Sequence, residues 1–146
     1  MPFKILHNNS NEGHNLRFGY DEYRHAEIHF IEDLLVVTSY ERGEAHVIKI
    51  NISKGIDNAK VVDRKQIPSN YCPKYTSDES PQARSVMEDN FLYFLIDRKN
   101  LAKINALTLE IIKESKIELP GSEWSKDYGI MRDDSTNTIS IIDQDN

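Results

Sequence analysis

The chain has 146 residues, of which 38% are hydrophobic and 29% charged, and its formal net charge is −6. This composition is typical of a single folded domain, here residues 1–146, and it excludes a chain that is disordered throughout. The negative charge opposes nonspecific binding to nucleic acid or to an anionic membrane and favours a basic partner.

Cysteine content and hydropathy indicate where the protein works. Cys72 is the only cysteine, so no internal disulfide can form, and a reducing compartment is expected. Residues 1–9 lack an apolar run of signal-peptide length, and the longest uninterrupted apolar run is Phe91 to Ile96. We therefore expect a cytoplasmic protein with no membrane partner.

Short runs rich in Val, Ile, Tyr and Phe follow one another along the chain, separated by turn residues. This arrangement predicts an all-β domain. From Ile48 to Ile52 the isoleucines alternate with Lys49 and Asn51, so we expect one apolar and one solvated face. The run Phe91 to Ile96 does not alternate, which predicts an inner strand covered on both faces. The predicted strands are residues 34–40, 45–52, 60–67, 91–97 and 138–142.

A pattern of two apolar residues, a charged residue and an aspartate occurs three times, each time ahead of a strand-like run. The three copies end at Asp33, Asp89 and Asp133. Such recurrence is typical of repeat architectures, and we interpret the aspartates as turn residues that cap their own backbone. Because Lys-Ile-Asn at 49–51 also recurs at 103–105, each full unit is predicted to contain four strands.

The repeated unit resembles a blade of a β-propeller, a four-stranded meander with short hairpins and a longer link to the next blade. The most blade-like segment is Leu101 to Lys113, where Leu109 replaces the usual turn glycine; the counterpart segment has Gly55. The resemblance covers about residues 25–143 and rests on pattern, without Trp-Asp or Gly-His signatures. It implies propeller-like blades, about two and a half units, too few to close a ring. A β-sandwich or an open curved sheet is the alternative.

Two structural alternatives stay open. Leu101, Ile104, Leu107 and Ile111 are also spaced for one face of a helix, although the repeat favours strands. The incomplete third unit leaves sheet edges that must be covered. Either the N-terminal segments 3–6 and 16–20 complete it, or copies of the chain form a homo-oligomer.

The sequence contains no recognisable catalytic motif. His25, Glu27 and His29 would share one face of a strand, a candidate three-ligand metal site, but hydrogen-bonded strand histidines are the simpler interpretation. Cys72 has no oxyanion-type glycine turn around it. The chain also lacks a nucleophile elbow and a glycine-rich phosphate loop. We therefore predict no catalytic residues, no metal and no cofactor.

Binding surfaces follow from charge and aromatic content. Lys60, Arg64 and Lys65 form a basic strand without an aromatic residue, which favours an edge strand protected by its charges over a nucleic-acid site. The two links that follow the prolines at 68 and 120 combine acids with aromatic residues, the preferred anchors of protein interfaces. The predicted partner-binding residues are Tyr71, Tyr75, Asp78, Glu79, Glu123, Trp124 and Asp127.

The sequence as a whole predicts a non-enzymatic protein-binding module. Small size, negative charge and the lack of a catalytic motif are typical of an inhibitor or immunity-type protein that blocks a basic partner such as a nuclease toxin. The alternative is a carbohydrate- or ligand-binding propeller assembled by oligomerisation.

Overall fold

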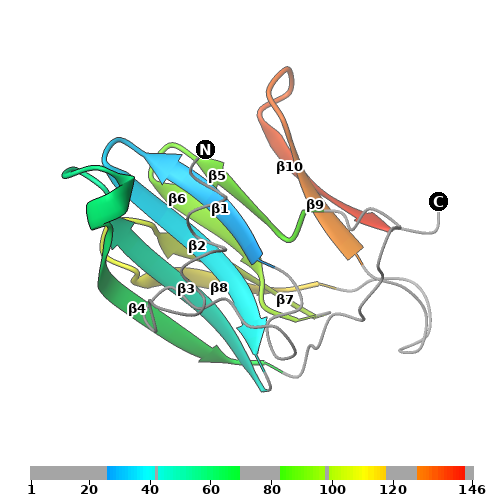
Figure 1. Cartoon of the computed structure of the whole chain (residues 1–146). Coiled ribbons are helices and arrows are strands. Elements are labelled where there is room, and N and C mark those ends of the chain that lie inside the picture. Colours follow the sequence, from blue (N-terminus) through cyan, green and yellow to red (C-terminus); the bar gives the residue numbers. More distant parts are fainter. Residues whose placement is uncertain (1–25, 42, 70–82, 98, 118–127, 144–146) are drawn as a thin grey trace, which may run out of the picture.

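The computed structural model describes residues 26–41, 43–69, 83–97, 99–117 and 128–143. These residues form three antiparallel sheets with hardly any helix (Figure 1). Each sheet is a meander, because strands that are neighbours in sequence are also paired in space. The predicted all-β fold of repeated antiparallel meanders is confirmed.

The first two sheets have four strands each, and the third is a hairpin. Sheet 1 has the order β1 (Ala26–Ile31), β2 (Leu34–Glu41), β3 (Glu44–Asn51) and β4 (Lys60–Pro68), with the 3-10 turn η2 (Ile56–Asn58) before β4. Sheet 2 has the order β5 (Ser85–Glu88), β6 (Phe91–Leu95), β7 (Asn100–Asn105) and β8 (Ile111–Lys116). Sheet 3 pairs β9 (Tyr128–Asp133) with β10 (Thr138–Asp143). The segment with helical spacing is therefore the strand β7 and the start of β8.

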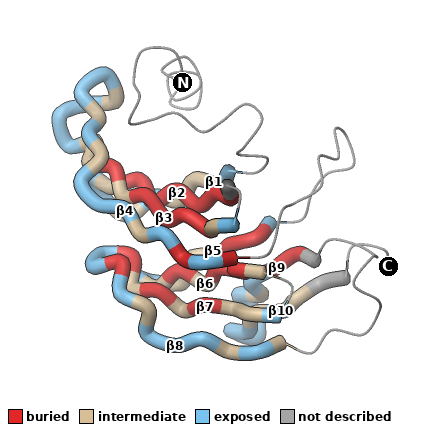
Figure 2. Tube along the Cα trace, turned by 90° about the horizontal axis from the view of Figure 1, so that it is seen from below, coloured by how far each residue is buried: buried red, intermediate tan, exposed pale blue. Residues whose placement is uncertain are grey.

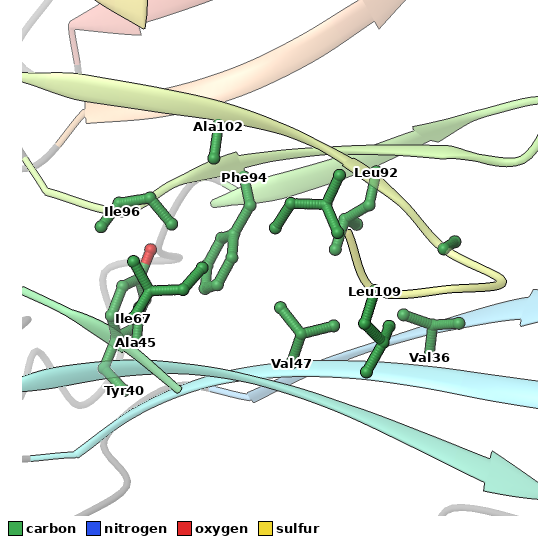
Figure 3. Close-up of a cluster of buried hydrophobic side chains, with 12 residues drawn as sticks. Val36, Tyr40, Ala45, Val47, Ile67, Leu92, Phe94, Ile96, Ala102 and Leu109 are labelled. Atoms are coloured by element: carbon green, nitrogen blue, oxygen red, sulfur yellow. The ribbon is translucent and has the colours of Figure 1, made fainter. Parts of the chain in front are cut away.

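Sheets 1 and 2 pack face to face, and the main hydrophobic core lies between them (Figure 2). Figure 3 shows Val36, Tyr40 and Val47 of sheet 1 pointing toward Leu92 and Phe94 of sheet 2. The rings of Tyr40 and Phe94 have centroids 5.3 Å apart at a tilt of 47°. Apolar burial of this kind, at about 25 cal/mol per Å², is the main force that holds the two sheets together.

The Lys-Ile-Asn recurrence is a structural repeat. In both sheets the register against the last strand shifts immediately after the lysine, at Lys49 in β3 and at Lys103 in β7. The asparagine that follows forms the same turn in each unit: the side chain of Asn51 accepts the N–H of Ser53 at 2.8 Å, and that of Asn105 accepts the N–H of Leu107 at 2.9 Å. The repeated tripeptide thus encodes a β-bulge followed by an Asx turn.

Gly55 and Leu109 occupy matching positions in this turn. Both have a left-handed backbone, with φ of 90° at Gly55 and 60° at Leu109. A leucine in this region costs about 1–2 kcal/mol. Leu109 is 2% exposed and belongs to the core between the sheets, so burial of its side chain offsets that cost.

The sequence pattern treats Asp33, Asp89 and Asp133 as equivalent positions of the repeat. In the structure the first two are displaced from each other by one residue. The first hairpin turns at Glu32 and Asp33 and the second at Asp89 and Asn90, so Asp89 matches Glu32 and not Asp33. Glu32 and Asp89 have the same left-handed backbone, with φ of 49° and 53°. Asp133 ends β9 and precedes a longer turn. The first residue of this two-residue turn must have a left-handed backbone. An aspartate can occupy either the first or the second position of the turn.

The solvated face predicted for β3 is also wrong. Ile48 and Ile50 are buried on the outer side of sheet 1, while Val47, on the opposite face, is buried in the core between the sheets. Nζ of Lys49 donates to the backbone carbonyl of Leu107 in the second sheet. The lysine therefore lies at the margin of an interface between sheets, where a charged head on a long apolar stem can be accommodated.

β6 was predicted to be an inner strand covered on both faces. Its inner position is confirmed, but one of its faces is only partly covered. β6 is an inner strand, paired with β5 and β7. Phe94 is buried on one face, whereas Phe91 and Tyr93 are only half-buried on the other. Nζ of Lys103 lies 4.4 Å from the centre of the Phe91 ring and 5.7 Å from that of Tyr93.

The predicted edge strand is confirmed. β4 is the last strand in the order of sheet 1 and carries Lys60 and Arg64 at exposed positions. Charged side chains on an edge strand oppose pairing with another chain.

Candidate functional site

The residues predicted to bind a partner lie outside the described residues, and so do Cys72 and His25. Their placement is not tested, and they stay predictions. These partner-binding residues are Tyr71, Tyr75, Asp78, Glu79, Glu123, Trp124 and Asp127.

A group of polar side chains lies instead between sheets 1 and 2, where their first strands meet. It consists of Glu27 and His29 of β1, Thr38 of β2, and Arg84 and Ser85 at the start of β5, and is called the Ser85 cluster. Side chains alternate along a strand, so Glu27 and His29 share one face of β1. Both reach Ser85, which places that face toward the second sheet.

The carboxylate of Glu27 fixes the start of β5. It accepts the N–H of Arg84 at 2.6 Å, the N–H of Ser85 at 2.8 Å and the hydroxyl of Ser85 at 2.6 Å. Hydrogen bonds to a charged acceptor are roughly twice as strong as neutral ones. Three of them on one partly buried carboxylate make Glu27 the main polar link between the two sheets.

The Ser85 hydroxyl makes three contacts that use its whole bonding capacity. A hydroxyl has one proton to donate and two lone pairs that accept. The proton goes to Glu27, because an ionised carboxylate only accepts. Nε2 of His29 at 2.7 Å and Oγ1 of Thr38 at 2.9 Å must then both donate to Ser85. His29 therefore has its proton on Nε2, assigned from this network.

Burial keeps His29 neutral. Desolvation lowers the pKa of its imidazole below the ordinary value of 6.5, and the carboxylate of Glu27 only partly opposes this shift. A neutral imidazole with its proton on Nε2 is the form that donates to Ser85. At neutral pH the network is therefore complete without a charge on His29.

The cluster resembles a catalytic triad in its residue types but not in its proton arrangement. In a triad the histidine accepts the serine proton and the acid orients the histidine. Here the acid takes the serine proton and the histidine donates to the serine oxygen. Ser85 is 2% exposed, so a substrate has no direct access to its oxygen. The chemistry of this arrangement is structural: it joins two sheets.

Further polar contacts cross between the same two sheets. The Tyr40 hydroxyl donates to the carbonyl of Leu95, and the Ser69 hydroxyl donates to that of Ile96 at 2.6 Å. Each is buried, and a buried carbonyl left without a donor is costly. Together with the Ser85 cluster these bonds fix the relative position of the sheets.

The first strands of the three sheets lie side by side. β1 adjoins β5, and β5 adjoins β9. The N–H of Ile130 in β9 donates to the carbonyl of Ala83 at 2.7 Å, and Nη1 of Arg132 donates to that of Met87 at 3.1 Å. The Ser85 cluster therefore lies at the seam where consecutive units meet.

Within the described residues, no three or more His, Cys, Asp or Glu side chains are grouped in a way that could hold a metal ion. Glu27 and His29, two of the three residues considered for a metal, are directed at Ser85 instead. The same residues contain no helix long and apolar enough to cross a membrane.

Comparison with protein-family models, with curated proteins and with solved structures found no match to this chain.

Proposed function

We propose that this protein is a non-enzymatic protein-binding module, a small acidic inhibitor of the immunity type that blocks a basic partner such as a nuclease toxin. The Ser85 cluster is the observation that carries the proposal. Serine, histidine and carboxylate meet there in a buried network with the wrong proton arrangement for nucleophilic catalysis. These residues hold the two sheets together. We therefore expect the partner to bind at the surface of the protein.

The third sheet offers a described surface of suitable chemistry. Hydrogen bonds from Ser135 hold the pKa of Asp133 below its ordinary value, so this carboxylate stays ionised. Met131 on the same hairpin is 48% exposed, and Asp134 in the turn is exposed as well. An exposed apolar side chain close to an ionised carboxylate suits a basic partner, with charge speeding the encounter and the apolar group contributing contact.

The test begins with a defined partner. If the gene adjacent to that of this protein encodes a protein with a basic C-terminal toxin domain, that domain is purified and its binding measured by calorimetry at low and high salt. The proposal expects a complex that weakens as salt rises and that inhibits the toxin. A sugar-utilisation gene cluster, or a toxin domain that stays fully active with an excess of this protein, would contradict it.

Variants of the same complex test the predicted partner-binding residues. Tyr71→Ala, Tyr75→Ala and Trp124→Ala are expected to weaken binding, by about 2 kcal/mol at an anchor residue. Ile112→Ala, on an exposed position of β8, is the matched control for removal of an apolar side chain. Full affinity in all three aromatic variants would show that the binding face lies elsewhere.

A second function is supported by the order of the first strands. Side-by-side β1, β5 and β9 are the arrangement of inner strands in consecutive propeller blades. Because about two and a half units do not close a ring, several copies would have to assemble, giving a carbohydrate- or ligand-binding propeller. Solution mass discriminates: a closed dimer or trimer favours this function, and a monomer favours the inhibitor.

A further inference from the structure

The strand β10 lies at the edge of sheet 3. Among the described strands it pairs with β9 alone, in continuous register from Thr138 opposite Asp133 to Asp143 opposite Tyr128. In an antiparallel pair every second residue directs its backbone N–H and C=O away from the partner strand. β10 therefore presents a row of backbone donors and acceptors on the side away from β9. Figure 1 shows this hairpin projecting beside the two four-stranded sheets.

The corresponding outer edges of sheets 1 and 2 are protected against pairing with another strand. β4 carries four charged residues and β8 carries three. In each sheet the register between this last strand and its neighbour is also interrupted, after Lys49 in sheet 1 and after Lys103 in sheet 2. Charges and β-bulges at an edge are the usual means by which natural sheets oppose the addition of a strand.

β10 has neither form of protection. Its residues 138–142 include no charged residue and no proline, and its register with β9 is unbroken. Threonine and isoleucine occupy four of these five positions, so the β-propensity is high. The side chains of Thr138 and Ser140 are exposed. An edge strand of this kind is a template on which another extended segment can add.

The residues around this edge are acidic. Asp133 and Asp134 precede β10 and Asp143 ends it, while Arg132 is the only basic residue from 132 to 143, so these three aspartates and one arginine give a formal net charge of −2. Nε of Arg132 lies 3.1 Å from Oδ1 of Asp134 and offsets that charge. The N–H and the hydroxyl of Ser135 donate to Oδ1 of Asp133 at 2.9 and 2.6 Å, which stabilises the ionised carboxylate. A segment that adds here should therefore be basic.

The same acids oppose the pairing of β10 with a second copy of this chain. In an antiparallel pair of β10 strands, the Asp143 end of one copy would lie beside the Asp133 and Asp134 end of the other. A parallel pair would place each aspartate beside its own counterpart. Like charges opposite each other on neighbouring strands are destabilising. Charge thus favours a basic segment of another protein over a second copy.

We propose that the side of β10 away from β9 binds an extended basic segment of the partner protein as a third strand of sheet 3. Backbone hydrogen bonds to β10 supply the affinity, and lysine or arginine side chains of the added strand lie near the aspartates at its two ends. This mode of binding rests on the proposed function for the existence of a basic partner, and it adds the extended conformation in which that partner is recognised.

Hydrogen exchange with a defined peptide tests this mode of binding. The probe is the end-blocked peptide Lys-Thr-Val-Thr-Val-Thr-Lys, and exchange of the amides of the full-length protein is followed by NMR with and without it. Strand addition predicts that exchange slows by about tenfold or more at every second amide of β10 and is unchanged in β4 and β8. The control peptide has the same side chains with its internal amides N-methylated. It keeps the charge and loses the backbone donors, so it should give no protection.

A matched pair of variants tests the same edge from the side of the protein. Ser140→Lys places a charge in the middle of the exposed edge and should weaken binding of the probe by about tenfold. Ser53→Lys, at an exposed position in a turn of sheet 1, changes the net charge equally and should leave binding close to that of the wild type. Because the N-methylated peptide leaves the protein unaltered, the comparison of peptides stays decisive even if Ser140→Lys disturbs the hairpin.

Equal protection by the two peptides would overturn the proposal, since charge alone would then account for binding. Protection of the β10 edge that is already complete in the isolated protein, or that grows with protein concentration, would also overturn it, because another occupant would hold the edge. If a toxin domain is bound and inhibited while exchange in β10 is unchanged in that complex, strand addition is wrong and the inhibitor function stands. If the probe protects β10 and no toxin domain is inhibited, the inhibitor function is wrong and the binding site stands.

Discussion

The hydroxyl oxygen of Ser85 lies 2.7 Å from Nε2 of His29, and this bond joins the first strand of one sheet to the first strand of the next. Because the Ser85 proton is directed to Glu27, the histidine is the donor and the serine the acceptor. The contact thus links successive units of the repeat. Substitutions at these residues are therefore expected to change the free energy of unfolding.

Loss of the Glu27 carboxylate should weaken the whole fold. Glu27→Ala removes the acceptor of two backbone N–H groups and one hydroxyl at the sheet interface. We expect the free energy of unfolding to fall by about 2–4 kcal/mol in urea titrations, because buried donors are left without a partner. Glu114→Ala, at an exposed position of β8, is the control and should change it by less than about 0.5 kcal/mol. Equal effects of the two substitutions would show that the carboxylate contributes nothing.

Ser85 should not react as a nucleophile. Its oxygen is buried and both lone pairs accept hydrogen bonds, so an organophosphonate reagent for activated serines is expected to leave the folded protein unmodified. Mass spectrometry of the intact protein measures this directly. Stoichiometric modification that disappears in Ser85→Ala would instead establish an active-site serine and overturn the non-enzymatic assignment.

Stability should fall on mild acidification because of His29. Its folded-state pKa lies below 6.5, so as pH drops below about 6.5 the unfolded chain takes up a proton that the folded protein does not. The free energy of unfolding therefore decreases from pH 6.5 downward until the folded pKa is passed, and this group contributes no slope above about pH 7.5. Urea titrations from pH 8 to pH 5 measure the effect.

His29→Gln is the matched variant for the pH experiment, because a glutamine amide can still donate to Ser85 but does not titrate. It should show a shallower decline below pH 6.5 than the wild type. The carboxylate of Glu27, which acts on the pKa of His29, is retained in both proteins. An identical slope would assign the pH dependence to other groups.

Leu109→Gly compares two contributions of Leu109 to stability: the backbone strain of a left-handed leucine and the packing of its side chain in the core. Glycine would remove a left-handed leucine at φ 60°, a gain of about 1–2 kcal/mol. It would also remove a side chain from the core, at a cost of about 2–5 kcal/mol. We expect a net loss of about 2 kcal/mol in thermal or urea unfolding. Leu107→Ala, at an exposed position of the same turn, should be close to neutral, and a more stable Leu109→Gly protein would show that strain prevails.

Sequence patterns predicted the strands well because their signals are local. β-branched and aromatic runs bounded by turn residues identified β2, β3, β4, β6 and β10 with their ends close to those observed. The Lys-Ile-Asn repeat correctly indicated a repeated structure, since a bulge and an Asx turn are encoded by the residues that form them. The aspartate alignment was wrong by one residue because an acidic side chain does not specify its position within a turn.

Backbone preference and side-chain alternation act over a few residues, so an all-β chain of repeated meanders and the left-handed turn at Gly55 can be predicted from the order of the amino acids. The left-handed backbone at Leu109 depends on the burial of its side chain between the sheets. The contact of Lys49 with the second sheet arises from the packing of the sheets, and so do the contacts of Glu27 and His29 with Ser85, 58 and 56 positions further along the chain. Alternation divides a strand into two faces without saying what covers each one. That choice is made when the sheets stack, by burial of apolar area and by completion of hydrogen bonds between residues far apart in sequence.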